Sequence, residues 1–287
     1  MCLRSRSTQR GNHMPKVILT GSNGFIGKNF KTVLEKTWEV IPVEFNDCWL
    51  FLKTFEDWDD VEFILHQGAI SDTTETNISK IHDYNVCFTI SLFEIAKVKG
   101  IPVKYASSAS VYGNLAPNYN PLNYYALSKL TVDYWVQDHI EEFSHIQGFR
   151  YFNVYGPNEE DKVERNQSSP ISKFIHQAKK DGEIILFHCS ERTKRDFIHV
   201  DDVINIVLDN DKGSGIYDLG TSNPISFEDV GNCVAECYNA EIKYIGFPPH
   251  LSNKYQHYTC AKEEWGDYQF KTVEDYVREV SLGEREL

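Results

Sequence analysis

The sequence predicts an α/β fold, a doubly wound parallel sheet followed by a smaller C-terminal α/β lobe. Three observations predict it. Short apolar runs alternate with segments of helical apolar spacing over residues 16–156, an order that is typical of parallel βαβ units. A glycine-rich turn joins the first apolar run to the first helical segment. The alternation becomes looser after residue 157, where we expect the second lobe to begin.

Each element of the first half follows from a local pattern. Apolar runs that end at turn residues indicate strands, and apolar residues three and four apart indicate helices. Pro42 cannot donate to a neighbouring strand, so the second strand suits a sheet edge or a strand end. Gly100 ends the second helix. The expected strands are residues 16–20, 39–44, 61–69, 102–108 and 148–156, and the expected helices are residues 25–36, 78–98 and 121–143.

The second half begins with a polar loop over residues 157–169. We expect a disordered extension over residues 1–13, a first domain over 14–168, and a second over 169–287 that is partly interleaved with the first. The expected helices are residues 170–181, 200–209, 226–238 and 272–281, the expected strands are 184–187 and 216–219, and "GFPPH" at 246–250 opens a loop.

Composition excludes several classes of protein. The formal net charge of −13 argues against a nucleic-acid partner, which would require a basic surface. No apolar run is long enough to span a membrane, and residues 1–13 lack the apolar stretch of a signal peptide. The seven cysteines are scattered without zinc-site spacing, so we expect buried, reduced thiols, no metal site and a cytoplasmic location.

The turn "TGSNGFIG" places Gly21, Gly24 and Gly27 three residues apart between a strand and a helix. Glycine lets a diphosphate approach the backbone, and the helix N-terminus behind it offers N–H groups and a partial positive charge. A plain turn would need only one glycine, so the first domain is predicted to be a Rossmann-type dinucleotide-binding domain. Glu44 ends the second strand, where an acid would hold ribose hydroxyls and favour NAD; an ordinary exposed glutamate is the alternative.

In "PLNYYALSKL", Tyr125 and Lys129 are four residues apart and therefore share one helix face. A nearby ammonium lowers the pKa of a phenol, and the pair can then exchange a proton with a substrate hydroxyl. Ser108 leaves the fourth strand and can bond the same substrate oxygen. Chance spacing, core packing and a turn serine are the alternatives, but the three residues together with the glycine turn indicate a catalytic site.

The segments "TGSNGFIG", "SSASVYG" and "YALSK" resemble those of the extended short-chain dehydrogenase/reductase family, which includes nucleotide-sugar epimerases, dehydratases and reductases. The likeness runs from about residue 14 onward. Within that family the ADP-heptose 6-epimerases are the most similar group. The segments that carry this closer likeness are "LHQGAISDTTE", "PLNYYALSK", "GFRYFNVYGP", "KRDFIHVDDV" and "YIGFPPHLSNKYQHYT".

The resemblance implies inversion at C6 of an ADP-heptose, by hydride removal to a tightly bound nicotinamide cofactor and return to the other face. Tyr125 would be one base, with Ser108 and Lys129 beside it. Lys162, in "YGPNEEDK", stands where the family has a second base; a solvated surface lysine is the alternative. Lys129 would also hold the cofactor ribose. The resemblance further implies a homo-oligomer that makes heptose precursors of bacterial surface polysaccharide.

Other residues receive roles only through the resemblance. Arg195 would bind the substrate diphosphate, where a planar guanidinium suits phosphate oxygens; a surface ion pair with Asp196 is the alternative. The expected cofactor contacts are Phe25, Ile26, Gln67, Gly68, Ala69, Ser71 and Val154, and the expected substrate contacts are Asn153, Phe187, Ser190 and Tyr255, where core packing explains Phe187 and Tyr255 as well.

Three features depart from the family pattern. Gln67 replaces a usual glutamate, residues 45–58 match poorly, and the loop after Lys162 is longer. The family favours NADP, whereas Glu44 favours NAD, so NADP is expected with NAD as the alternative. Two other functions stay open: a 4-epimerase, dehydratase or reductase acting on another nucleotide sugar, and a non-catalytic dinucleotide sensor. A 4-epimerase would not need Lys162, and a sensor would not need both Tyr125 and Lys129.

Overall fold

The computed structural model describes residues 14–114, 116–159, 162–163, 167–248 and 255–285. The expected extension over residues 1–13 lies outside them. The chain forms two compact units. The first contains the chain up to Val111, Pro121–Arg150 and Ile204–Tyr217, and the second contains Tyr112–Asn120, Tyr151–Val203 and Asp218–Leu287. The units are therefore interleaved, and no single boundary between residues 168 and 169 separates them.

The first unit is built on a six-stranded sheet with the strand order β10-β5-β4-β3-β1-β2. Its strands are β1 (Lys16–Thr20), β2 (Glu39–Val43), β3 (Val61–His66), β4 (Val103–Ser108), β5 (Ile146–Tyr151) and β10 (Gly215–Leu219). β1 pairs in parallel with β2 and with β3, and β3 with β4. The predicted α/β class is confirmed, and Pro42 lies in β2 at the sheet edge, as predicted.

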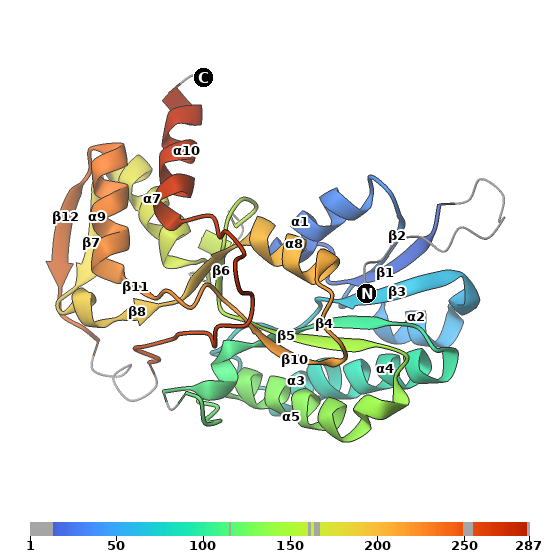
Figure 1. Cartoon of the computed structure of the whole chain (residues 1–287). Helices are drawn as coiled ribbons and strands as arrows, with labels where there is room; N and C mark the ends of the chain where they lie inside the picture. The colour runs from blue at the N-terminus through green and yellow to red at the C-terminus, as the bar shows by residue number, and fades with distance from the viewer. Residues whose placement is uncertain (1–13, 115, 160–161, 164–166, 249–254, 286–287) are drawn as a thin grey trace. The chain divides into compact units, whose positions relative to one another are not determined.

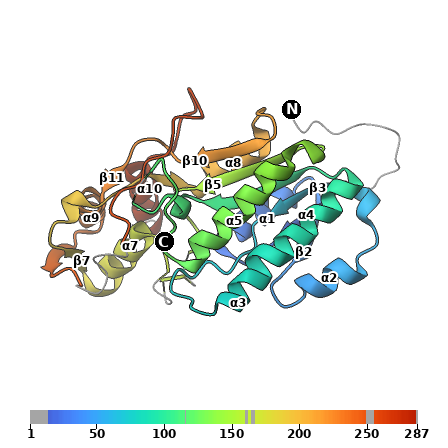
Figure 2. The ribbon, with the colours of Figure 1, turned by 90° about the horizontal axis from the view of Figure 1, so that it is seen from below.

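Helices cover both faces of this sheet (Figure 1). α1 (Phe25–Leu34) and α8 (Val200–Asp209) lie on one face, and α4 (Phe88–Lys99) and α5 (Tyr124–His139) lie on the other. Figure 2, seen from below, shows α4 and α5 side by side in front of the strands. Asn123 caps α5 by accepting a hydrogen bond from the backbone of Ala126 at 2.8 Å. The short elements of this unit are α2 (Cys48–Thr54), η1 (Trp58–Asp60), α3 (Ile78–Ile81) and η4 (Ile140–Glu142), while η3 (Ala109–Tyr112) ends where the second unit begins.

The predicted helix over residues 78–98 is present but is not uniform. A π-helical segment, η2 (His82–Cys87), joins α3 to α4, and Gly100 ends α4 in the left-handed conformation with φ 65°. π segments are rare and insert a residue into the helical repeat, so apolar spacing alone does not reveal them. The helix α2 was also missed, because it is short and has no side-chain cap to mark its start.

The prediction of one strand over residues 148–156 is wrong. β5 ends at Tyr151, and the separate strand β6 (Asn153–Tyr155) pairs in parallel with β9 (Phe197–His199) in another sheet. Phe152 separates them, because its backbone N–H donates to Leu219 O while the next N–H, of Asn153, donates to Asp196 O. A continuous apolar run thus serves two sheets, which periodicity cannot indicate.

The second unit packs three helices against a two-stranded parallel sheet of β7 (Glu183–Phe187) and β12 (Glu241–Ile245). The helices are α7 (Pro170–Asp181), α9 (Phe227–Tyr238) and α10 (Val273–Arg285). Ser226 and Asp229 form a reciprocal capping box at the start of α9. The remaining elements are η5 (Ser190–Arg192), β8 (Lys194–Arg195) and β11 (Ile225–Ser226); β8, β9, β11 and β12 were not predicted.

Each unit has its own apolar core. Leu92, Phe93 and Tyr105 belong to the first core, and Tyr155 and Val277 belong to the second. The six described cysteines are free thiols, and Cys2 lies outside the described residues. The expectation that the thiols are buried holds for Cys48 alone among the six, since Cys189 is exposed and the other four are half-buried. No helix in the described ranges has the length and apolar character needed to cross a membrane.

Candidate active site

The glycine turn brings backbone against backbone at the end of β1. Gly21 adopts φ 68°, and a Cβ on it would lie 2.6 Å from the Cα of Gly68, in the loop after β3. A Cβ on Gly27 would lie 2.0 Å from the carbonyl oxygen of Gly21. Gly24 is the N-cap of α1 and provides no side-chain acceptor for that helix end. Only glycine permits this close approach, and the arrangement leaves a side-chain-free cradle at a helix N-terminus.

That cradle fits the diphosphate of a dinucleotide, which needs close backbone approach and a partial positive charge. Glu44 follows β2, and its Oε1 accepts from Ser22 Oγ at 2.6 Å and from Asn23 N at 3.0 Å. The acid is therefore fixed to the glycine turn by one oxygen. Of the neighbouring predicted contacts, Phe25 is buried and Ile26 is half-buried in the first turn of α1.

A buried histidine ties the cradle to the sheet. Thr89 Oγ1 donates to Asn85 O at 2.8 Å, so it accepts from His66 Nε2 at 2.9 Å and the imidazole proton lies on Nε2. His66 Nδ1 then accepts from Thr20 Oγ1 at 2.8 Å, and Thr20 Oγ1 accepts from Gly68 N at 2.9 Å. Burial lowers the pKa of His66 to about 3, so the ring stays neutral.

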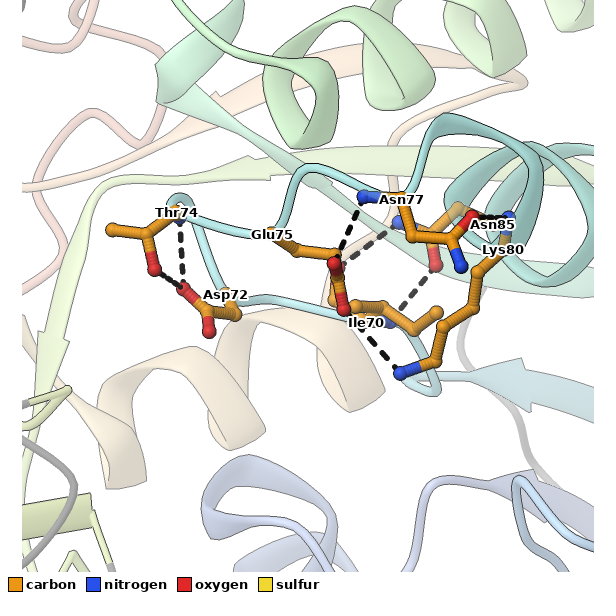
Figure 3. A network of polar contacts seen from close by, with 7 residues as sticks. All are labelled: Ile70, Asp72, Thr74, Glu75, Asn77, Lys80 and Asn85. Carbon is orange, nitrogen blue, oxygen red and sulfur yellow. Dashed lines mark hydrogen bonds and ion pairs between the residues drawn. The ribbon is translucent and has the colours of Figure 1, made fainter.

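The loop after β3 is clamped by the π-helical segment (Figure 3). Asn85 accepts from Ile70 N at 2.8 Å and donates to Ile70 O at 3.0 Å. The same amide donates to Ser128 Oγ at 3.0 Å, and Ser128 Oγ donates to Tyr125 O at 2.7 Å. One buried asparagine thus fixes both the predicted cofactor loop and the backbone of the predicted catalytic tyrosine. The loop residues around Ile70 are Gln67 and Gly68, which are half-buried, and Ala69 and Ser71, which are exposed.

The exposed continuation of this loop is ordered by its own side chains (Figure 3). Asp72 Oδ1 accepts from Thr74 N at 2.8 Å and from Thr74 Oγ1 at 2.7 Å, and these bonds lower the pKa of its carboxyl. Glu75 accepts from Asn77 N at 2.9 Å and from Lys80 Nζ at 3.3 Å. Asn77 caps α3 through Lys80 N at 3.0 Å. The "SDTTETN" segment therefore holds the loop in place up to the following helix.

The predicted catalytic residues of the first unit lie together. The Ser108 hydroxyl lies near the Tyr125 phenol and acts to lower its pKa. Lys129 is buried behind them, and its Nζ donates to Ala106 O at 2.7 Å and lies 6.0 Å from the centre of the Tyr125 ring. The carboxyl end of β4 and the N-terminal half of α5 therefore present a hydroxyl, a phenol and an amine as one group.

Burial dominates the proton affinities of this group. Burial lowers the pKa of Lys129 to about 8. It raises the pKa of the Tyr125 phenol, and the nearby Ser108 hydroxyl opposes this rise. The sequence led us to expect that the nearby lysine lowers the tyrosine pKa. The difference arises because desolvation of the phenolate outweighs other effects here. A further positive charge beside the phenol would be needed to lower its pKa.

In the second unit, Arg195 is the most unusual of the predicted residues. It is only 5 % exposed, and its Nη1 has no hydrogen-bond partner among the described residues. The guanidinium lies 5.3 Å from the ring centre of Tyr255 and 5.9 Å from that of Phe227. Burial lowers its pKa to about 10, so it remains charged at neutral pH. A buried guanidinium with an unpaired N–H costs roughly 1–3 kcal/mol, which an anionic ligand would recover.

Aromatic side chains surround this arginine. Phe187 and Tyr255 both contact Phe247, with ring centres 5.1 and 5.4 Å apart. Ser190 is buried and donates to Glu228. The predicted residues Asn153 and Val154 lie in β6, where Asn153 Oδ1 accepts from Thr259 Oγ1 at 3.2 Å. The alternative of an Arg195–Asp196 ion pair finds no support, since Asp196 instead accepts from four groups, Thr221 N, Thr221 Oγ1, Ser222 N and Ala261 N.

Lys162 and Val163 are helical, and Glu159 anchors the backbone of Lys162. The backbone N–H of Lys162 donates to Glu159 O at 2.9 Å, and the Glu159 carboxylate accepts from Ser169 N at 2.9 Å and Ser169 Oγ at 2.7 Å. Ser169 caps α7. Burial lowers the pKa of Lys162, and the charge of Glu159 opposes that shift. A lysine with a lowered pKa is suited to act as a base.

The predicted site residues are divided between the units. His66, Asn85 and Glu159 were not predicted, although a histidine within an apolar strand is itself an unusual feature. The first unit contains the predicted residues Gly21, Gly24, Phe25, Ile26, Gly27, Glu44, Gln67, Gly68, Ala69, Ser71, Ser108, Tyr125 and Lys129. The second unit contains Asn153, Val154, Lys162, Phe187, Ser190, Arg195 and Tyr255.

The π-helical register also groups three side chains on the surface. The ligand atoms of His82, Asp83 and Cys87 lie within 4.8 Å of one another. His82 and Cys87 are five residues apart and meet only because the segment is π-helical. The sequence prediction that the protein has no metal site stays a prediction.

Comparison with known proteins decides the family. Residues 17–220 match the NAD dependent epimerase/dehydratase family. The chain belongs to that family. As a member of the NAD dependent epimerase/dehydratase family it is an enzyme that uses a nicotinamide dinucleotide, and the predicted resemblance is confirmed. The glycine cradle at the ends of β1 and β3 is where such a dinucleotide fits.

Individual relatives are more specific. The chain is 40% identical over 225 residues to an ADP-L-glycero-D-manno-heptose-6-epimerase of Brachyspira hyodysenteriae, an alignment that covers 74% of this chain and 70% of the relative. It is 32% identical to the same enzyme of Alkalilimnicola ehrlichii, over 91% of this chain and 95% of the relative. The crystal structure of the Helicobacter pylori ADP-L-glycero-D-manno-heptose-6-epimerase is similar with a TM-score of 0.79 and 26% identity, covering 95% and 97% of the two chains.

The cradle predicts the effect of one added methyl group. Gly27→Ala places a Cβ 2.0 Å from the Gly21 carbonyl oxygen, so the turn must move. Overpacking of this kind costs about 1–3 kcal/mol, and we expect the dissociation constant for the dinucleotide, measured by fluorescence titration, to rise about 10- to 100-fold. Gly213→Ala is the control, because no atom lies within 4 Å of its Cβ position. Unchanged affinity in the Gly27 variant would contradict the site.

Proposed function

We propose that this enzyme interconverts ADP-D-glycero-D-manno-heptose and ADP-L-glycero-D-manno-heptose. The observation that carries the proposal is the group formed by Tyr125, Ser108 and Lys129 at the carboxyl end of β4, in the same unit as the glycine cradle. The names of the relatives in two bacteria supply the substrate. A nicotinamide dinucleotide supplies removal and return of hydride at C6 of the heptose.

The residues of the first unit then have separate tasks. Tyr125 exchanges a proton with the C6 hydroxyl, and Ser108, which lies near the phenol, holds the same oxygen. Lys129 remains buried beneath them and contributes positive charge and a donor for the cofactor ribose. Asn85 fixes the backbone on either side of the reacting group, through Ile70 and through Ser128. These residues orient groups and move protons, and hydride transfer belongs to the cofactor.

Inversion requires proton exchange on both faces of the C6 carbon. We assign the second base to Lys162, whose pKa is lowered by burial and whose backbone N–H donates to Glu159 O. This assignment also separates the proposal from a 4-epimerase, which would not need that lysine. Arg195 is assigned to the substrate diphosphate, because its buried Nη1 has no hydrogen-bond partner in the described part of the chain.

The charge at the end of β2 supports one form of the cofactor over the other. Glu44 keeps one carboxylate oxygen on Ser22 and Asn23, which holds its negative charge beside the glycine turn. A 2′-phosphate at that position would meet a like charge, whereas ribose hydroxyls would donate to it. We therefore propose NAD, although the resemblance of the sequence had favoured NADP.

A non-catalytic dinucleotide sensor is the alternative of another class. The arrangement of Tyr125, Ser108 and Lys129 favours an enzyme, since a sensor has no use for a phenol beside a buried amine. A reductase or dehydratase acting on another nucleotide sugar is the other alternative. The homo-oligomer, the cytoplasmic location and the role in surface-polysaccharide precursors stay predictions.

Tyr125→Phe tests the proton-transfer role. General acid–base catalysis contributes about 10²–10⁴-fold, so we expect kcat for ADP-D-glycero-D-manno-heptose, followed at C6 by NMR, to fall by that factor. Dinucleotide affinity should stay the same, because the phenol exchanges the proton of the substrate. Full turnover in the variant would reject the role of Tyr125. Absence of turnover in the unaltered enzyme would reject the substrate.

Lys162→Met separates the second base from the first. We expect the rate of epimerisation to fall about 10²-fold. The epimer whose hydroxyl contacts Tyr125 should still be oxidised. The near-ultraviolet absorbance of the reduced cofactor measures this oxidation. Lys173→Met, on the same unit but in α7, serves as the control. A variant that loses oxidation of both epimers points to a structural role for Lys162, and a fully active one excludes it as a base.

Glu44→Gln tests the choice of cofactor. We expect the unaltered enzyme to bind NAD at least about tenfold more tightly than NADP, a difference of ~1.4 kcal/mol. Glutamine retains an acceptor for Ser22 and Asn23 but removes the charge, so the difference should shrink, mainly through tighter NADP binding. Isothermal titration with both dinucleotides measures it. Tighter binding of NADP by the unaltered enzyme would refute NAD.

A further inference from the structure

One face of α5 carries three ionisable side chains that all contact β4. Tyr125, Lys129 and Asp133 are spaced four residues apart and so lie in one row. Tyr125 lies near Ser108, and Lys129 donates to Ala106 O at 2.7 Å. The third member of the row, Asp133, has no role in the function proposed above. The row nevertheless aligns the helix with the strand at three successive turns.

Asp133 is the most fully bonded member of the row. Its Oδ1 accepts from Tyr105 OH at 3.0 Å, and its Oδ2 accepts from Ser107 Oγ at 3.0 Å and from Arg150 Nε at 2.9 Å. All four residues are at most 5 % exposed. Tyr105 and Ser107 alternate along β4 and therefore face α5 together. The carboxylate thus joins the helix to β4 and, through Arg150, to β5.

The neighbouring strand leaves room for this contact. Gly148 of β5 lies so close to Tyr105 that a Cβ on it would be 2.4 Å from the phenol oxygen. The Tyr105 ring can reach Asp133 only because residue 148 has no side chain. The same strand then supplies Arg150 two residues later, on the same face. Two strands are therefore shaped around one carboxylate.

Charge gives Asp133 a second effect on the catalytic pair. Asp133 of α5 and His66 of β3 interact electrostatically with the Lys129 ammonium, which lies 6.0 Å from the centre of the Tyr125 ring. His66 is neutral, so Asp133 is the anion of this set. Burial lowers the pKa of Lys129, and the negative charge of Asp133 opposes that shift. Burial raises the pKa of Asp133 itself, and Arg150, Ser107 and Tyr105 oppose that rise.

We propose that Asp133 is the positioning residue of the Tyr125–Lys129 pair: it fixes the alignment of α5 on β4 and provides the counter-charge of the buried lysine. The proposal depends on the proposed roles of Tyr125 and Lys129. It assigns no contact with substrate to Asp133, which acts only through the two residues one and two turns before it.

Asp133→Asn removes the charge and keeps the shape. We expect kcat to fall about 10²-fold, since a misplacement of about 1 Å can cost that much. In the unaltered enzyme we expect dinucleotide affinity to fall as Lys129 deprotonates near pH 8. In the variant we expect this loss of affinity to occur at lower pH. The sign follows because loss of the anion lowers the pKa of Lys129 further. Fluorescence titrations across pH 6–10 measure this shift.

Two further variants separate alignment, charge and simple loss of stability. Arg150→Gln breaks the same buried ion pair but retains the anion beside Lys129, so the melting temperature should fall without a shift of the binding profile to lower pH. Tyr105→Phe combined with Ser107→Ala retains the charge and removes both bonds to β4, so kcat should fall while the profile stays in place. Lys104→Met removes a buried β4 cation that bonds Val207 O of α8, and should affect stability alone.

The proposal is overturned if Asp133→Asn and Arg150→Gln change the binding profile alike, or if Asp133→Asn leaves both kcat and the profile unchanged. It is also overturned if the Tyr105/Ser107 variant keeps full kcat, and this outcome remains measurable if Asp133→Asn does not fold. Because dinucleotide binding needs no sugar substrate, the pH profile tests Asp133 even if ADP-heptose is not turned over. Absence of ADP-heptose turnover would reject the proposed function. The positioning role of Asp133 would then be tested by the pH dependence of dinucleotide binding.

Discussion

Close contact between backbones at the carboxyl edge of the sheet is the constraint on which the candidate site depends. Gly21 contacts the backbone of Gly68, and Gly27, in the first turn of α1, contacts the carbonyl oxygen of Gly21. Neither Gly21 nor Gly27 has space for a Cβ. Helix α1 can therefore start directly at the end of β1, and its N-terminus faces the space where a diphosphate fits. The neutral imidazole of His66 maintains the contact by holding Thr20, which binds the Gly68 backbone.

The second layer of organisation is a set of buried polar groups that connect the elements around the candidate catalytic residues. Asn85 lies in a π-helical segment and binds Ile70 and Ser128, so one side chain connects the cofactor loop with α5. Asp133 connects the same helix with β4 and β5. Buried polar groups of this kind are costly unless every partner is present, which is why they fix one arrangement of the catalytic helix rather than several.

Burial also sets the chemistry. It lowers the pKa values of Lys129 and Lys162 and leaves Arg195 with an N–H that has no partner in the described residues. An amine with a lowered pKa can exchange protons near neutral pH, and an unpaired guanidinium N–H is suited to an anionic ligand. Burial thus leaves cationic groups suited to proton exchange or to an anionic ligand in a chain whose net charge is −13.

The sequence alone determined the α/β class, the glycine turn, and the Tyr125–Lys129 pair, because each depends on local spacing: period two or 3.6, a positive φ, or a shared helix face. It did not indicate the division of residues 148–156 between two sheets, the π-helical segment, or the partners of His66, Asn85 and Asp133. Those depend on which strands and helices meet, and on burial that raises one pKa and lowers another. The contacts and the burial both come from residues far apart in the chain, so only the tertiary structure could decide these features.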